Sequence, residues 1–286
     1  MILFAPVIGI VHNGPQLAAD RYTYLPTLPW AVLAGAALAL LIRASGPSRR
    51  LAARLAVPAC AIAVLAVLAA AQTRTWASSE RLWTHTASTA PSSVAYYNLG
   101  VLSERQGRWD EAIDYYRQAL RLKPGYPEAH YNWGVILARQ QRPTEAIEHY
   151  REALRIKPDH AEAHYNWGLL ASAAGRDDEA IEHYRLALQA KPQLAAAHNN
   201  WGNLLVRQGH WSSAVDHYRE ALRLKPDYAE AHNNIASAFA RQERWDEAIS
   251  HYRKALEIRP DFGPARENLE RLLSRPESRA LSRSGS

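Results

Sequence analysis

The sequence predicts an all-α chain in which two transmembrane helices precede an α-solenoid of five helix-pair repeats and a capping helix. Three observations predict it: two uncharged apolar runs near the N-terminus, a strict 34-residue period from residue 93 onward, and an amphipathic segment after the last repeat. The chain has 286 residues, of which 48% are hydrophobic, enough for one large domain or two modest ones. A folded chain is therefore expected in place of a disordered one.

The two apolar runs, residues 28–42 and 55–71, carry no charged side chain. A helix needs about 20 apolar residues to cross a bilayer, so both runs are on the short side. Four arginines lie in the intervening loop, 43–54, and the positive-inside bias places that loop in the cytoplasm. Residues 28–71 thus predict an integral protein of the inner or plasma membrane, in contact with lipid through two spans, whose repeats are extracytoplasmic. A buried hairpin in a soluble protein is the alternative.

Three further segments flank these parts. Residues 1–27 are predicted to form a truncated helix and an extracytoplasmic loop, and residues 72–92 a connector. Residues 275–286 are rich in arginine and serine, which predicts a disordered tail. The single cysteine, Cys60, excludes a disulfide framework built from this chain alone.

The 34-residue period is carried by three columns of residues. The eighth position is small: Gly100, Gly134, Gly168, Gly202 and Ala236. The twenty-fourth position is tyrosine: Tyr116, Tyr150, Tyr184, Tyr218 and Tyr252. The thirty-second position is proline: Pro124, Pro158, Pro192, Pro226 and Pro260. Small residues let two helices approach closely, tyrosines fill the space between repeats, and proline ends the second helix.

These columns predict five units over residues 93–262 and a capping helix at 263–274 with a polar outer face. The units are residues 93–126, 127–160, 161–194, 195–228 and 229–262. Their small, large and proline positions resemble the tetratricopeptide repeat (TPR) family in every unit. The resemblance implies a right-handed superhelix whose first helices line a concave groove for a peptide or a partner helix.

One face of the predicted first helices carries asparagine at the sixth position of every unit. These residues are Asn98, Asn132, Asn166, Asn200 and Asn234. Asparagine is a poor helix former, so five in register indicate a purpose other than helix stability. Its amide can pair with the backbone of an extended polypeptide whatever that polypeptide's sequence, which predicts a ladder that grips a backbone. The alternative is that each asparagine hydrogen-bonds a neighbouring repeat.

Two more columns belong to the predicted peptide-binding groove. The fifth position holds Tyr97, Tyr131, Tyr165, Asn199 and Asn233. The thirteenth holds Arg105, Arg139, Arg207 and Arg241, with Ala173 interrupting. The arginines either contact a ligand or form a solvated face paired with Glu128, Glu162 and Glu230 at the second position. The asparagine ladder is similar to that of the soluble O-GlcNAc transferase, which holds extended protein substrates.

Charge and histidine spacing argue against two other kinds of partner. The net charge is +6, but residues 93–274 hold 24 basic and 25 acidic side chains, so the excess belongs to the ends and no nucleic acid is expected. Two histidine columns also repeat, one of His130, His164, His198 and His232 and one of His149, His183, His217 and His251. Neighbours in a column lie roughly 10 Å apart, too far to share one ion, so no metal is predicted. The sequence predicts no cofactor and no catalytic residue.

A second resemblance concerns the membrane-proximal part. Residues 19–26, together with 72–76 and 82–83, resemble the stretch that joins the last spans to the repeats in the transmembrane-and-TPR O-mannosyltransferase-like group. That resemblance implies an extracytoplasmic glycosyltransferase, but its many spans and acidic catalytic loop are absent, and Asp20 beside Arg21 is more simply an ion pair. Two hypotheses follow: a membrane-anchored TPR module that binds extended polypeptide, and the acceptor-binding end of a membrane O-glycosyltransferase.

Overall fold

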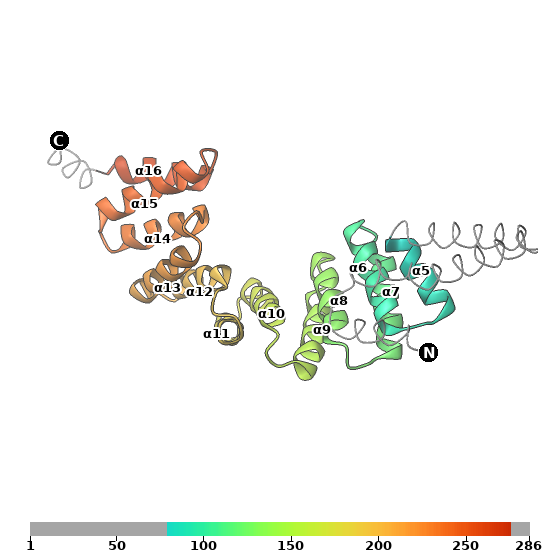
Figure 1. The fold of residues 1–286 in the computed structure, drawn as a ribbon. Coiled ribbons are helices and arrows are strands. Elements are labelled where there is room, and N and C mark those ends of the chain that lie inside the picture. The colour runs from blue at the N-terminus through green and yellow to red at the C-terminus, as the bar shows by residue number, and fades with distance from the viewer. Residues whose placement is uncertain (1–78, 276–286) are drawn as a thin grey trace, which may run out of the picture. The chain divides into compact units, whose positions relative to one another are not determined.

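The computed structural model describes residues 79–275, and regular structure in that part consists of twelve α-helices (Figure 1). They are α5 (Ser79–Thr89), α6 (Ser93–Arg105), α7 (Trp109–Leu122), α8 (Pro127–Arg139), α9 (Pro143–Ile156), α10 (Ala161–Ala173), α11 (Asp177–Ala190), α12 (Ala195–Arg207), α13 (Trp211–Leu224), α14 (Ala229–Arg241), α15 (Trp245–Ile258) and α16 (Gly263–Leu273). The chain divides into two units, one ending at Leu102 and one beginning at Ser103. The all-α solenoid predicted from the repeat period is confirmed.

Helix ends follow directly from proline chemistry. Pro127 and Pro143 stand in the first turns of α8 and α9, where a missing N–H costs nothing. At the other end, α7 stops at Leu122, and its C-cap Lys123 has the extended backbone (φ −139°) that the following proline favours. The same arrangement recurs at Lys157, Lys191 and Lys225. The proline column therefore sets where the second helices end.

In the second, third and fourth repeats, a glycine of the first helix packs against a tyrosine of the second. A Cβ placed on Gly168 would lie 2.6 Å from Cε1 of Tyr184, far inside van der Waals contact. Gly134 and Gly202 show the same approach, at 2.7 and 2.6 Å, to the tyrosines of their own repeats. These tyrosines are at most 1% exposed. The small residue of the eighth position thus makes room for the large residue of the twenty-fourth.

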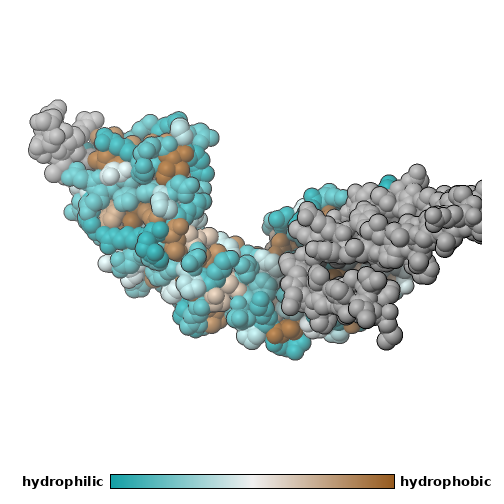
Figure 2. Space-filling model, in the orientation of Figure 1, coloured by the Kyte–Doolittle hydropathy of each residue, from teal (hydrophilic) through white to brown (hydrophobic). Residues whose placement is uncertain are grey.

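In the part of the chain that begins at Ser103, each helix pair also packs on the next. The second helices α7, α9, α11, α13 and α15 each contact the first helix that follows, and α16 closes the row. Buried Leu272 and half-buried Leu269 of α16 join Tyr252 and Phe239 in the last core cluster. The helix face that would otherwise be open is covered, as a solenoid end requires. The visible surface is mainly hydrophilic with smaller apolar patches (Figure 2).

The turns inside the repeats place one residue in the left-handed region. Glycine occupies this position at Gly107, Gly175 and Gly209, whereas Gln141 (φ 60°) and Glu243 (φ 59°) carry side chains there. A residue with a Cβ is disfavoured in this region by about 1 kcal/mol, partly offset by the entropy that glycine loses on folding.

We therefore expect Gln141→Gly to raise the free energy of unfolding by about 0.5 to 1 kcal/mol. Urea unfolding followed by circular dichroism measures the change. The matched control is Gly175→Gln, which should lower stability by a similar amount. A destabilised Gln141→Gly variant would contradict the assignment of strain to this turn.

The prediction of two transmembrane helices is corrected by this architecture. Helices in the described part run from 11 to 14 residues, and none is long and apolar enough to cross a bilayer. The fold class is accordingly an all-α solenoid of helix pairs. The two apolar runs, the N-terminal loop with Asp20, and the predicted tail from residue 276 lie outside the described residues.

The predicted localisation depended on those spans and is corrected with them. Placing the repeats outside the cytoplasm required two helices across the membrane and the positive-inside bias of residues 43–54. No membrane-spanning helix is found among residues 79–275. Integral membrane localisation is therefore withdrawn. The physical reason for the error is that an apolar run was assigned by hydropathy although it was shorter than a bilayer requires.

Candidate functional site

In the part of the chain that begins at Ser103, the sixth-position asparagines lie half-buried on consecutive first helices. They donate hydrogen bonds to the preceding repeat. Nδ2 of Asn166 on α10 donates to the Tyr131 hydroxyl on α8 at 3.1 Å. Nδ2 of Asn200 on α12 donates to the Tyr165 hydroxyl, also at 3.1 Å. Each asparagine thus reaches the fifth-position residue of the preceding repeat. The fifth and sixth columns form one connected ladder.

Farther along the solenoid, amides replace the hydroxyl acceptors. Nδ2 of Asn234 on α14 donates to Oδ1 of Asn199 and to Oδ1 of Asn203, both at 3.0 Å. Asn199 and Asn233 in turn donate to Oδ1 of the asparagine that follows them, at 3.2 Å. The ladder here consists of asparagines alone.

The first two ladder positions differ from the rest. Nδ2 of Asn98 on α6 donates to the Val94 carbonyl of its own helix at 2.8 Å. Nδ2 of Asn132 on α8 points to the Tyr116 hydroxyl at 3.4 Å. Tyr97 lies beside Asn98 on α6 and is also partly buried.

One ladder residue was missed by sequence reasoning. Asn268 on the capping helix α16 donates through Nδ2 to Oδ1 of Asn233 at 3.1 Å, the same contact that its counterparts make. It stands 34 residues after Asn234, so extending the period by one unit beyond the fifth repeat would have identified it. The capping helix continues the ladder as well as covering the core.

The tyrosines of the fifth position present neutral hydroxyls. Burial raises the pKa of Tyr131 and Tyr165, and the hydrogen bonds received from Asn166 and Asn200 oppose that rise only in part. Tyr131 also contacts the ring of His160, with centroids 4.8 Å apart. The fifth-position column is therefore aromatic and neutral on α8 and α10, and it carries amides on α12 and α14.

The thirteenth-position arginines contact the preceding repeat and not the glutamates of the second position. The guanidinium of Arg139 lies 5.1 Å from the ring of Trp109, and that of Arg241 lies 5.6 Å from the ring of Trp211. Arg207 pairs with Asp177 and also donates to Oγ of Ser172 at 3.1 Å. All three are exposed, as is Arg105 at the end of α6.

Two second-position glutamates have partners elsewhere. Glu162 pairs with Lys191 at 3.0 Å and Glu230 with Arg259 at 2.9 Å, the basic residue that follows the second helix of the same repeat. These exposed pairs contribute little to stability. Of the two alternatives for the arginine column, pairing with Glu162 and Glu230 is thus not what the structure shows.

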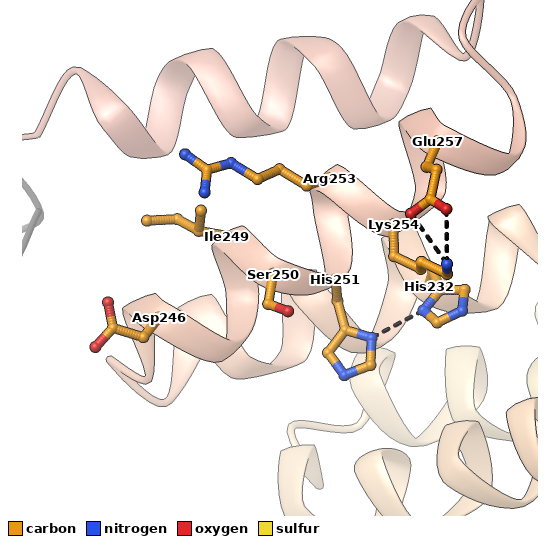
Figure 3. A pocket seen from close by; sticks show the side chains of 8 residues that line it. All are labelled: His232, Asp246, Ile249, Ser250, His251, Arg253, Lys254 and Glu257. Atoms are coloured by element: carbon orange, nitrogen blue, oxygen red, sulfur yellow. Dashed lines mark hydrogen bonds and ion pairs between the residues drawn. The ribbon is translucent and has the colours of Figure 1, made fainter. Parts of the chain in front are cut away.

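The two histidine columns meet inside each of the last four repeats, which spacing within one column did not indicate. Nδ1 atoms of the four pairs lie 2.8 to 3.2 Å apart: His130 with His149, His164 with His183, His198 with His217, and His232 with His251. Figure 3 shows the last pair, with the two rings joined edge to edge between α14 and α15. The pairs tie the two helices of a repeat together.

Backbone contacts define which nitrogen carries the proton in these pairs. Nε2 of His232 donates to the Pro226 carbonyl at 3.1 Å, and Nε2 of His164 to the Pro158 carbonyl at 3.0 Å. In these two pairs the Nδ1 of the first-helix histidine is therefore the acceptor, and the Nδ1–H of the second-helix histidine donates to it. Burial, followed by the neighbouring histidine, lowers the pKa of His183 and His251 to about 4.

The described residues offer binding groups. No group of three metal-binding side chains occurs within residues 79–275. The inner faces of the first helices present amides, hydroxyls and guanidinium groups. Such groups hold a partner by hydrogen bonds and charge.

Comparison with known families decides the identity of the repeats. The model of the tetratricopeptide repeat matches residues 64–127, 97–161, 131–195 and 199–261, well over half of the chain. The chain belongs to the tetratricopeptide repeat family. The TPR resemblance seen in the small, large and proline columns is thereby confirmed.

Solved TPR structures share this fold. The crystal structure of YrrB, described as a TPR protein with an unusual peptide-binding site, has a TM-score of 0.57 at 21% identity and covers 66% of this chain and 97% of its own. MamA gives 0.53 at 25% identity, with 58% and 91% covered. PilF of Pseudomonas aeruginosa gives 0.53 at 20% identity, with 67% and 97% covered. At 20 and 21% identity, PilF and YrrB show the TPR fold alone.

A curated relative matches only a short stretch. The probable biofilm formation methyltransferase WspC of Pseudomonas putida is 49% identical over 39 residues, which are 14% of this chain and 9% of that protein. A match of about one TPR unit carries no methyltransferase activity over. The resemblance to the O-mannosyltransferase-like group is not shown by these comparisons.

Proposed function

We propose that this TPR array is a protein-interaction module that binds an extended polypeptide along the inner faces of its first helices. The observation that carries the proposal is the ladder of half-buried asparagines in register on α10, α12, α14 and α16, each held by the preceding repeat. The glycosyltransferase alternative finds no support among the described residues, and it is not proposed.

The hydrogen bonds between repeats leave some donors and acceptors of these amides unused. An asparagine side chain has two donor hydrogens and two acceptor lone pairs. Asn200 uses one donor on Tyr165 and accepts one bond from Asn199, so one hydrogen and one lone pair remain. Asn234 uses both donors and accepts one bond, so a lone pair remains. The remaining donor hydrogens and lone pairs can form hydrogen bonds with the C=O and N–H groups of a bound backbone.

Contacts between repeats also orient the amides before a ligand arrives. A free asparagine side chain would lose rotational freedom on binding, and fixing it beforehand lowers that cost. The architectural role and the binding role of the ladder are therefore compatible. Because the groups recognise backbone, the array should accept many sequences.

The test compares peptide binding by the full chain with that of a variant carrying Asn166→Ala, Asn200→Ala and Asn234→Ala. Three lost hydrogen bonds of about 0.5 to 1.5 kcal/mol each should weaken binding of several unrelated, unstructured peptides by at least about tenfold. Fluorescence anisotropy measures the affinity, and circular dichroism verifies that the variant is folded.

Two controls separate binding from architecture. Glu148→Ala with Asp216→Ala changes exposed side chains of the second helices and should leave affinity unchanged. Tyr165→Phe removes the acceptor of Asn200 but keeps its amide, so it should cost stability and retain most binding. Equal affinity of the folded triple variant and the unaltered chain would show that the ladder is only architectural.

A further inference from the structure

A polar cavity of about 360 Å³ lies where the ladder ends, between α14, α15 and α16. Its walls include Ser237 and Arg241 of α14, Tyr252 of α15, and Asn268 and Arg271 of α16. Asn268 is the last residue of the ladder, and Arg271 follows it by three residues on the same helix. The cavity is therefore continuous with the proposed polypeptide-binding face.

The charge of the cavity is positive. Three arginines line it, Arg241, Arg271 and Arg275, against one acidic residue, Glu243. Arg241 lies against the ring of Trp211, and neither Arg241 nor Arg271 forms an ion pair with any described residue. Most second helices, by contrast, carry arginines paired with a carboxylate three residues away, as Arg185 is with Glu182 and Arg223 with Glu220.

The polar floor of the cavity has a fixed orientation. Ser237 donates to the Asn233 carbonyl at 3.0 Å, so its oxygen accepts from the buried Tyr252 hydroxyl, 2.9 Å away. Burial raises the pKa of Tyr252, which keeps the hydroxyl neutral although Arg271 opposes the rise. No negative charge from the floor neutralises the arginines.

The repeat register shows that this end of the face differs from the other. The ninth position changes along the solenoid from Val135 and Leu169 through Asn203 and Ser237 to Arg271. Leu169 is 37% exposed, so the ninth-position column is apolar on α8 and α10 and becomes cationic at α16. In this column a ligand meets a positive charge at the α16 end only.

We propose that this cavity binds a carboxylate of the polypeptide ligand, on a side chain or at a chain terminus, with Arg241 and Arg271 as the recognition residues. The inference rests on the proposed function and adds the class and polarity of the ligand. Guanidinium groups bind carboxylates through paired N–H donors, which gives direction as well as attraction. The bound polypeptide is thus acidic where it contacts α16.

The neighbouring cavity of about 420 Å³ supplies a contrast (Figure 3). It also holds two basic residues, Arg253 and Lys254, but two acidic residues, Asp246 and Glu257, line it as well. Lys254 is bonded to Glu257 at 3.0 Å. Its walls come from α15 and His232, and no ladder asparagine lines it. A balanced cavity of this kind has no comparable preference for an anion.

The test measures two labelled, unstructured peptides with amidated C-termini that differ only in Glu or Gln at one end, using the full chain at low salt. We expect the Glu peptide to bind at least fivefold more tightly. Arg241→Gln with Arg271→Gln should abolish that preference, whereas Arg253→Gln should keep it. A preference that survives in the double variant would overturn the proposal.

A second arm works without a peptide and separates this proposal from the first. Acetate, at constant ionic strength, should raise the Tm of the unaltered chain and not that of the double variant. If no peptide binds at all, the proposed function fails, and a Tm rise confined to the unaltered chain still supports the carboxylate site. A rise with inorganic phosphate and none with acetate would overturn the carboxylate assignment in favour of a phosphorylated ligand.

Discussion

Lowering the pH from 7 to 4 is expected to destabilise the repeat array by several kcal/mol. The four histidine pairs are the reason, because a charged imidazole is poorly accommodated between the two packed helices of a repeat. Burial is the largest cause that lowers the pKa of the second-helix residues His149, His183, His217 and His251, each to about 4, and the partner histidine is the next.

The direction follows from proton binding in the two states. In the unfolded chain these histidines take up a proton near pH 6.5, and in the fold only near pH 4. The unfolded state therefore binds more protons between these values, so stability is complete above pH 6.5 and is lost as the pH falls towards 4. With on the order of 1 kcal/mol per pair, the total is a large share of the 5 to 15 kcal/mol typical of a domain.

The first proton leaves the bond within a pair intact. It enters at Nε2 of the second-helix histidine, whose Nδ1–H continues to donate to the partner. The cost at this step is the burial of charge, and nearby Arg219 adds to it at His251 while Glu247 opposes it. A second proton would remove the acceptor nitrogen itself and separate the two helices.

Urea unfolding at pH 7, 6 and 5 measures this loss before the carboxylates protonate. The pKa of glutamates such as Glu182 and Glu220 is lowered below 4.5 by hydrogen bonds from Arg185 and Arg223, so they contribute only in stronger acid. Replacing all four second-helix histidines by Gln should flatten the pH dependence, and the exposed His210→Gln should not. Equal slopes for the fourfold Gln variant and the unaltered chain would exclude the pairs as the cause.

Tyr184→Ala is expected to lower the free energy of unfolding by about 3 to 5 kcal/mol, the range for removing a buried aromatic ring. Tyr184 is 1% exposed and fills the space beside Gly168 in the core of the third repeat, together with Ala180 and Leu204. Because stability in a solenoid is transmitted mainly between neighbours, loss at this central repeat should also weaken its contacts on both sides. Urea unfolding measures the change.

A double-mutant cycle shows whether the glycine and the tyrosine act as a pair. Gly168→Ala alone should destabilise, because its Cβ would lie 2.6 Å from the Tyr184 ring. In the Tyr184→Ala background the ring is gone, so the same change should be neutral or stabilising, giving a coupling of about 1 kcal/mol or more. Tyr184→Phe, which retains the ring, is the control and should cost less than about 1 kcal/mol. Additive effects would contradict the packing described here.

Local reasoning succeeded where a residue's neighbours along the chain decide its conformation. The period at Gly168 and Tyr184 identified helix pairs of the TPR family, and the proline column indicated where second helices end. It failed for the membrane spans, which were inferred from hydropathy in runs shorter than a bilayer needs. The predicted unit boundaries and groove residues stay predictions, and the latter are the subject of the peptide experiments.

The sequence by itself determined that the repeats are helical, which residues share a face of each helix, and that asparagine recurs on one such face. Only the tertiary structure decided which side chains meet: Asn200 with Tyr165, His164 with His183, and Glu162 with Lys191. It also placed Arg241 and Arg271 around one cavity. The reason is geometric. A helix turns 100° per residue whatever surrounds it, so faces can be read from spacing, whereas contacts between helices depend on how closely and at what angle packed side chains let them approach.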